Sequence, residues 1–75
     1  MSAEINYTVV IKADPNGGFW TQVPALPGCG SQGETLEKAL EMTKEAIEGY
    51  LTSLRKHGER IPADEDVVTR VAVSA

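Results

Sequence analysis

The chain has few of the residues and segments that mark secreted proteins, membrane proteins and metalloenzymes. Among its 75 residues are one cysteine, one histidine and one tryptophan. A single cysteine cannot form an internal disulfide, and an unpaired thiol is typical of the reducing cytoplasm. No apolar run approaches the roughly 18 residues that a membrane helix needs, and residues 1–6 lack the pattern of a signal peptide. We therefore expect a soluble, cytoplasmic protein.

Basic residues are also scarce. Seven lysines and arginines stand against eleven aspartates and glutamates, which gives a formal net charge of -4. This charge repels a phosphate backbone and argues against nucleic-acid binding as the main role. A basic protein partner fits the composition better.

The length leaves room for one domain, residues 1–75. A chain of this size buries only roughly 60% of the surface that it exposes when unfolded, so its core is small. Association with further copies would add burial. We therefore expect a homodimer or a higher homo-oligomer.

The apolar pattern predicts four strands and one helix. Alternating residues at period two indicate strands, and an apolar stripe with a Thr35 N-cap and Gly58 after its end indicates a long helix. Asn16 and Gly17 suit the positive φ angles of a hairpin between the first two strands. The expected strands are residues 5–12, 19–23, 29–32 and 67–73, and the expected helix is residues 36–57. The order predicts a two-layer β-β-β-α-β fold of the α+β class, with the helix on one face of the sheet.

The helix should present three stripes of different chemistry. The core stripe is predicted as Leu36, Leu40, Thr43, Ile47, Tyr50, Leu51 and Leu54. An acidic stripe, which is a candidate for attraction of a basic partner, contains Glu37, Glu41, Glu45 and Glu48. A stripe of small or pliable residues, which is a candidate oligomer contact or an intramolecular packing face, contains Ala39, Met42, Ala46, Gly49 and Ser53.

The sheet offers one further candidate surface. Trp20 and Gln22 fall on the opposite face of their strand from Phe19, Thr21 and Val23. With only one helix, that opposite face is left uncovered. A large aromatic outside the core is often part of a contact, so we predict Trp20 and Gln22 at an oligomer interface, with partial cover by neighbouring long side chains as the alternative.

No catalytic, metal-binding or cofactor-binding residue is predicted. The central strands carry no carboxylates that could converge as a two-metal nuclease requires, since Glu65 and Asp66 lie only at the start of the last one. Cys29 and His57 lack the neighbours that would activate a nucleophile or a base. The glycines at 28, 30 and 33 match a GxGxxG pattern without the βαβ unit that gives this pattern its function. We expect a protein that is not an enzyme.

The segment that follows the second strand carries a family resemblance. Its sequence is Val23-Pro24-Ala25-Leu26-Pro27-Gly28-Cys29, then Ser31-Gln32-Gly33-Glu34-Thr35-Leu36-Glu37-Lys38-Ala39-Leu40. This segment, within a likeness that runs from Tyr7 to about Pro62, resembles the HicB-like antitoxins of bacterial type II toxin–antitoxin systems.

The resemblance implies both a fold and a function. The fold would be a truncated ribonuclease-H-like sheet in which the last strand lies beside the first. The function would be to bind and neutralise a small basic HicA-type toxin that cleaves mRNA. Many relatives add a C-terminal DNA-binding domain, whereas this sequence stops at Ala75, so direct DNA binding is not expected. The alternative is a solitary oligomeric scaffold or small-ligand-binding domain without a toxin partner.

Overall fold

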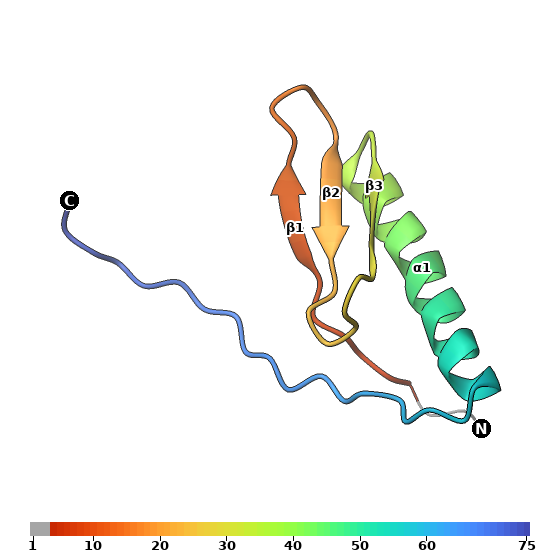
Figure 1. Ribbon diagram of the computed structural model, residues 1–75. Coiled ribbons are helices and arrows are strands. Elements are labelled where there is room, and N and C mark those ends of the chain that lie inside the picture. The colour runs from red at the N-terminus through yellow and green to blue at the C-terminus, as the bar shows by residue number, and fades with distance from the viewer. Residues whose placement is uncertain (1–3) are drawn as a thin grey trace.

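The computed structural model describes residues 4–75, which form a three-stranded sheet and one long helix (Figure 1). The elements are β1 (Val10–Ala13), β2 (Phe19–Gln22), β3 (Gly30–Gly33) and α1 (Leu36–Lys56). The sheet is antiparallel in the order β1-β2-β3, with Ile11 opposite Thr21 and Thr21 opposite Ser31. The α+β class and the order of these four elements are as predicted.

The β1–β2 hairpin is closed by local hydrogen bonds and two glycines. The Asn16 amide donates to the Asp14 carboxylate at 2.9 Å, and the Asp14 amide donates to the Gly18 carbonyl at 2.9 Å. Positive φ angles occur at Gly17 and Gly18 and at no non-glycine residue of the described chain. The turn therefore uses the second and third residues of Asn16-Gly17-Gly18 rather than the first two.

The loop between β2 and β3 supplies much of the core. Val23, Leu26 and Cys29 are buried, and backbone hydrogen bonds of 2.9–3.0 Å link these three residues in a compact turn. Gly28 has a φ of +79°, which lets the chain reverse before Cys29. Leu51 of α1 completes the buried cluster, and Tyr7, Val9 and Ile61 are among the residues packed against it.

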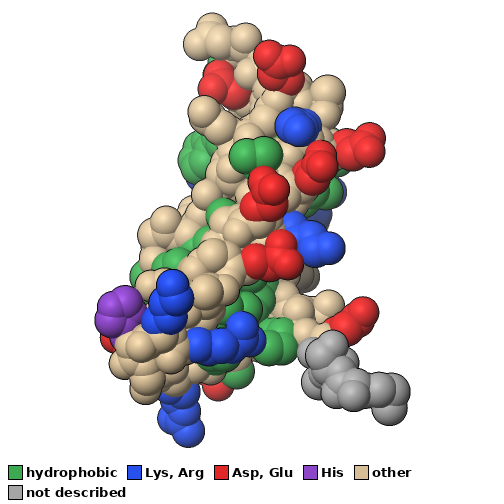
Figure 2. Space-filling view, turned by 90° about the vertical axis from the view of Figure 1, so that its right-hand side faces the viewer, with side chains coloured by type: hydrophobic (Ala, Val, Ile, Leu, Met, Phe, Trp, Pro, Cys, Tyr) green, Lys and Arg blue, Asp and Glu red, His purple; other side chains and the backbone are tan. Residues whose placement is uncertain are grey.

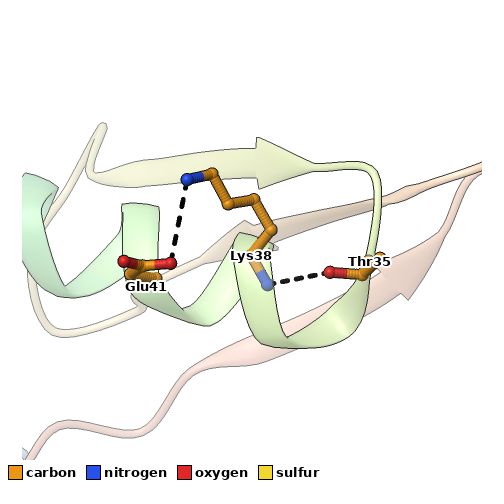
Figure 3. A network of polar contacts seen from close by, with 3 residues as sticks. All are labelled: Thr35, Lys38 and Glu41. Atoms are coloured by element: carbon orange, nitrogen blue, oxygen red, sulfur yellow. Dashed lines mark hydrogen bonds and ion pairs between the residues drawn. The ribbon is translucent and has the colours of Figure 1, made fainter.

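Both ends of α1 are capped as the sequence predicts. The Lys38 amide donates to Thr35 Oγ1 at 3.0 Å, which satisfies one of the free N–H groups of the first turn (Figure 3). At the other end, the Gly58 amide donates to the Arg55 carbonyl, and Gly58 has a φ of +66°. Glycine is favoured there because the left-handed conformation strains other residues.

The helix packs closely on β3, touches β2 less and has no contact with β1. At its tightest point, a Cβ added to Gly33 would lie 2.5 Å from the Ala39 backbone nitrogen. Ala39 is fully buried at this crossing. The predicted core stripe is wrong at its N-terminal end, since Leu36 and Leu40 are 45% and 41% exposed. The helix lies over β3 and does not contact β1. The side of the helix that carries these two leucines is therefore not covered by the sheet.

A buried pair of hydroxyls joins the helix to the sheet. Thr43 Oγ1 donates to the Ala39 carbonyl at 2.6 Å, and Thr21 Oγ1 and Thr43 Oγ1 share a hydrogen bond of 2.5 Å. Thr21 Oγ1 also accepts from the Ser31 amide at 3.0 Å. One polar side chain thus connects β2, β3 and α1 at the centre of the molecule.

The predicted last strand, residues 67–73, is not part of the sheet. After α1 the chain passes residues 4–9, where the Tyr7 hydroxyl donates to the Pro62 carbonyl at 2.6 Å. The Thr8 hydroxyl and amide both donate to Asp64 Oδ2, at 2.7 and 3.1 Å. Beyond these contacts, which we call the Asp64 anchor, the chain leaves the domain as an extended tail, residues 65–75 (Figure 1). The prediction of a fourth strand in the same sheet is therefore wrong for the single chain.

Candidate protein-binding surfaces

The four glutamates of the acidic stripe, Glu37, Glu41, Glu45 and Glu48, are all exposed. Glu37, Glu41 and Glu45 lie on the side of α1 away from its buried residues Ala39 and Thr43, whereas Glu48 lies beside the buried Leu51. Acidic side chains gather over the upper and middle part of this face with basic side chains among them, and further basic side chains lie toward the C-terminal end of the helix (Figure 2). The helix therefore presents an acidic surface that no part of the domain covers.

One glutamate of this stripe has a nearby cation. Lys38 Nζ lies 3.8 Å from Glu41 Oε2 (Figure 3). Both side chains are more than half exposed, at 58% and 66%, and an ion pair of this kind contributes little to stability. The other three glutamates of the stripe form no ion pair with a described residue.

The sheet face opposite the helix carries the aromatic that the sequence predicts. Trp20 is 40% exposed, and Gln22 is exposed on the same strand. Lys12 comes from the neighbouring strand, and its Nζ lies 5.0 Å from the centre of the Trp20 ring. A cation over an aromatic ring is attracted to its face and also covers part of it. The apolar area offered by Trp20 is therefore smaller than the sequence alone suggests.

The small-residue stripe of α1 is divided between the inside and the outside of the domain. Ala39 is buried against β3 and has no surface for a second chain, while Met42 and Ala46 are partly buried. Gly49 is exposed, and a Cβ at this position would meet no atom within 4 Å. Close packing inside the domain thus explains Ala39 but not Gly49.

Gly49→Ala is expected to stabilise the protein by about 0.5–1 kcal/mol, because glycine weakens a helix interior and the added methyl group enters open space. Chemical denaturation followed by circular dichroism measures the effect. Ser53→Ala, at an exposed position one turn further along, is the control and should give a smaller gain. A loss of stability in Gly49→Ala would show that another chain packs against this glycine.

The surroundings of Cys29 and His57 suit structural roles and do not activate either side chain for catalysis. Cys29 is buried beneath the loop, and burial raises the pKa of its thiol above the ordinary value, which suppresses the reactive thiolate. His57 Nδ1 lies 2.8 Å from the Ser53 carbonyl oxygen, to which it donates at the C-terminal end of the helix. Neither side chain has a partner among the described residues that would prepare it for catalysis.

The main hollows on the surface of residues 4–75 are open to solvent. No three histidine, cysteine, aspartate or glutamate side chains of this range are grouped as a metal site requires. A hollow of about 680 Å³ beside the β1–β2 hairpin is open to solvent. None of the helices formed by these residues has the length and apolarity to cross a membrane.

A groove between residues 4–9 and α1 was missed by the sequence analysis. It has a volume of about 670 Å³ and is lined by Ile5, Tyr7 and Val9 on one side and by Leu40, Ile47 and Leu51 among the helix residues on the other. Its signal in the sequence was the apolar pattern of residues 5–11 and of the helix, which we assigned to a closed core. The groove exists because the helix does not reach β1.

These features define a small α+β domain whose candidate sites are exposed binding surfaces. Residues 7–74 match the family model described as HicB_like antitoxin of bacterial toxin-antitoxin system, and the chain belongs to this family. A UPF0150 protein of Thermoplasma acidophilum is 52% identical over 60 residues, covering 80% of this chain and 87% of the relative. A UPF0150 protein of Synechocystis is 37% identical over 68 residues, covering 91% and 86% of the two chains. The family match extends over nearly the whole tail.

Proposed function

We propose that this protein is an antitoxin that binds and neutralises a small basic HicA-type mRNA-cleaving toxin without catalysis of its own. The observation that carries the proposal is the acidic stripe, four exposed glutamates of α1, three of which lie on the side of the helix away from Ala39 and Thr43. Such a surface attracts a basic protein and raises the rate of productive encounter. Family membership supports a role in a toxin–antitoxin system.

Neutralisation requires coverage of the toxin rather than chemistry on its substrate. The acidic stripe repels phosphate, so the antitoxin does not compete with the toxin for mRNA and instead approaches the basic surface that would bind it. In this proposal the protein acts in the cytoplasm, where the toxin meets mRNA, and direct DNA binding by residues 1–75 plays no part.

The direct test uses a short basic reading frame encoded beside the gene of this protein. We expect its product to cleave mRNA, to co-purify with this protein, and to lose its cleavage activity when the two are mixed at equal concentrations. An unrelated basic ribonuclease is the control, and its activity should not change. That control separates specific capture from general attraction between opposite charges.

Failure of both co-purification and inhibition would contradict the proposal. The alternative, a solitary oligomeric scaffold or small-ligand-binding domain, would then be favoured. The open hollow beside the hairpin would be its candidate ligand site.

Self-association is the second part of the proposal. A domain of 75 residues with an uncovered sheet face gains burial from a second copy. The sheet face around Trp20 and Gln22 remains one candidate contact. On the helix, Met42, Ala46 and Gly49 retain some surface, whereas Ala39 is buried within the domain.

A further inference from the structure

The helix covers only part of the sheet face on which it lies. Thr21 points toward α1, because its hydroxyl shares a hydrogen bond with Thr43, and Ile11 lies directly opposite Thr21 on the neighbouring strand. Residues that pair directly across two strands share a face, so Ile11 belongs to the side that α1 occupies. The helix does not contact β1, however, and Ile11 is 39% exposed. The part of this face next to β1 is therefore open.

Two apolar walls border the open part. Ile5 and Ile11 are exposed on the wall formed by residues 5–11, and Leu36 and Leu40 are exposed one turn apart on the flank of α1. The groove described above lies between the two walls. From Leu36 to Ile47 the helix wall is about 16 Å long, and residues 5–11 span about 20 Å. We call this surface the inner groove, with walls of Ile5, Val9, Ile11, Leu36, Leu40 and Ile47.

The backbone beside the inner groove is not free to pair with a strand. The Tyr7 hydroxyl donates to the Pro62 carbonyl, and the Thr8 amide donates to Asp64 Oδ2, so residues 62–64 already occupy this edge. A helix satisfies its backbone groups internally and needs only side-chain contacts. Three helical turns are about 16 Å long, which matches the helix wall. The inner groove therefore suits an amphipathic helix that inserts one apolar face.

The rim of the inner groove is mostly acidic. Glu41 and Glu48 each follow an apolar residue of the helix wall by one position, which places them about 100° further round the helix. Glu4 comes from the opposite wall and lines the groove together with Glu48. The lining also contains Lys44. Three carboxylates thus outweigh one ammonium group, and the rim attracts a helix that carries basic side chains beside its apolar face.

Other segments of this protein do not match that charge pattern. The α1 helix of a second copy would bring its own acidic stripe against Glu41 and Glu48, and like charges repel. The tail begins with Glu65 and Asp66, and the Asp64 anchor leads it away from the domain (Figure 1). The charge of the rim therefore favours a basic partner over a second copy or the tail.

We propose that the inner groove receives an amphipathic helix of the basic toxin, with its apolar side chains between Ile11 and Leu40 and its basic side chains against Glu41 and Glu48. This inference rests on the proposed function and names the surface through which it acts. Apolar anchors mainly determine how slowly a complex dissociates, whereas charges at the rim mainly determine how fast it forms. The inner groove thus holds the toxin that the acidic stripe attracts.

Leu36→Gln/Leu40→Gln removes two exposed leucines of the inner groove without a change in net charge. We expect the toxin, produced from the basic reading frame described above, to dissociate at least about tenfold faster from this variant. The association rate and its salt dependence should stay close to those of the wild type. Val71→Gln/Val73→Gln replaces two exposed valines of the tail and should leave both rates unchanged. Circular dichroism should show α1 in both variants, since all four residues are exposed.

Alkylation by iodoacetamide shows whether the bound toxin covers the groove. A Leu40→Cys protein and a Val71→Cys protein should both react when free, and Cys29 is buried in each. Saturating toxin should strongly slow the reaction of the Leu40→Cys protein and leave that of the Val71→Cys protein unchanged. Mass spectrometry of this chain follows both.

The outcomes separate this inference from the proposed function. The inference is wrong, and the proposed function stands, if the wild type neutralises the toxin but the Leu36→Gln/Leu40→Gln variant releases it at the wild-type rate. Full reactivity of the Leu40→Cys protein in the complex would have the same meaning. A wild-type protein that neither binds nor inhibits the toxin would contradict both.

Discussion

Gly33→Ala is expected to destabilise the fold strongly, because the added methyl group would push the helix away from the sheet. The new Cβ would lie 2.5 Å from the Ala39 nitrogen and 2.9 Å from the Ala39 Cα, both of which are backbone atoms. The helix would have to lift from β3, which would also strain the hydroxyl bond between Thr21 and Thr43. Overpacking of this kind costs about 1–3 kcal/mol, a large share of the total stability of a domain this small.

Thermal unfolding followed by circular dichroism measures this loss, and we expect a fall in Tm on the order of 10 °C. Two other glycines separate packing from backbone effects. Gly49→Ala meets open space and should stabilise, while Gly28→Ala also meets open space but has a φ of +79° and should cost about 1 kcal/mol from strain alone. An unchanged Tm in Gly33→Ala would show that α1 does not approach β3 as closely as the structure places it.

Reversal of two charges on the acidic stripe is expected to slow toxin capture about tenfold at low salt, because electrostatic attraction accelerates association by that order or more. The variant is Glu41→Lys/Glu45→Lys. Glu37 is kept because it stabilises the first turn of the helix, and Glu48 is kept because it lines the groove. The difference from wild type should shrink as salt screens the charges. Stopped-flow association at two salt concentrations measures it.

The control variant changes the net charge by the same amount at positions outside the acidic stripe. Glu59→Lys/Glu65→Lys alters two exposed glutamates outside α1 and should slow capture much less. Trp20→Ala should leave capture within about tenfold, or roughly 1.4 kcal/mol, because the aromatic lies on the sheet face opposite the helix. Equal slowing by the two charge variants would assign the effect to net charge alone. Loss of capture in Trp20→Ala would place the toxin on the sheet.

The parts of the fold that depend on neighbouring residues were predictable from the sequence. Thr35 and Gly58 act through backbone groups three residues away, and the prolines that follow β2 restrict their own φ angles. The exposed positions of the acidic stripe followed from helix periodicity in the same way. These features need no knowledge of how the elements meet.

The misassigned features depend on how elements meet. The positions of Leu36 and Leu40 follow from the placement of α1 over β3, which the close contact between Gly33 and Ala39 determines. Helix periodicity identifies an apolar side but not how far the sheet extends beneath it. The pattern of residues 67–73 is typical of a strand, yet pairing also needs an accessible edge, and the Asp64 anchor directs the tail away from its own.

The Asp64 anchor also has a consequence for kinetics. The hydrogen bonds from Tyr7 to Pro62 and from Thr8 to Asp64 join residues 55 and 56 positions apart, whereas the sheet pairs only consecutive strands. Local hairpins and helices form quickly, and contacts that close long loops come later and open more readily. The anchor should thus form last, and amide hydrogen exchange should be fastest in the segment that it holds.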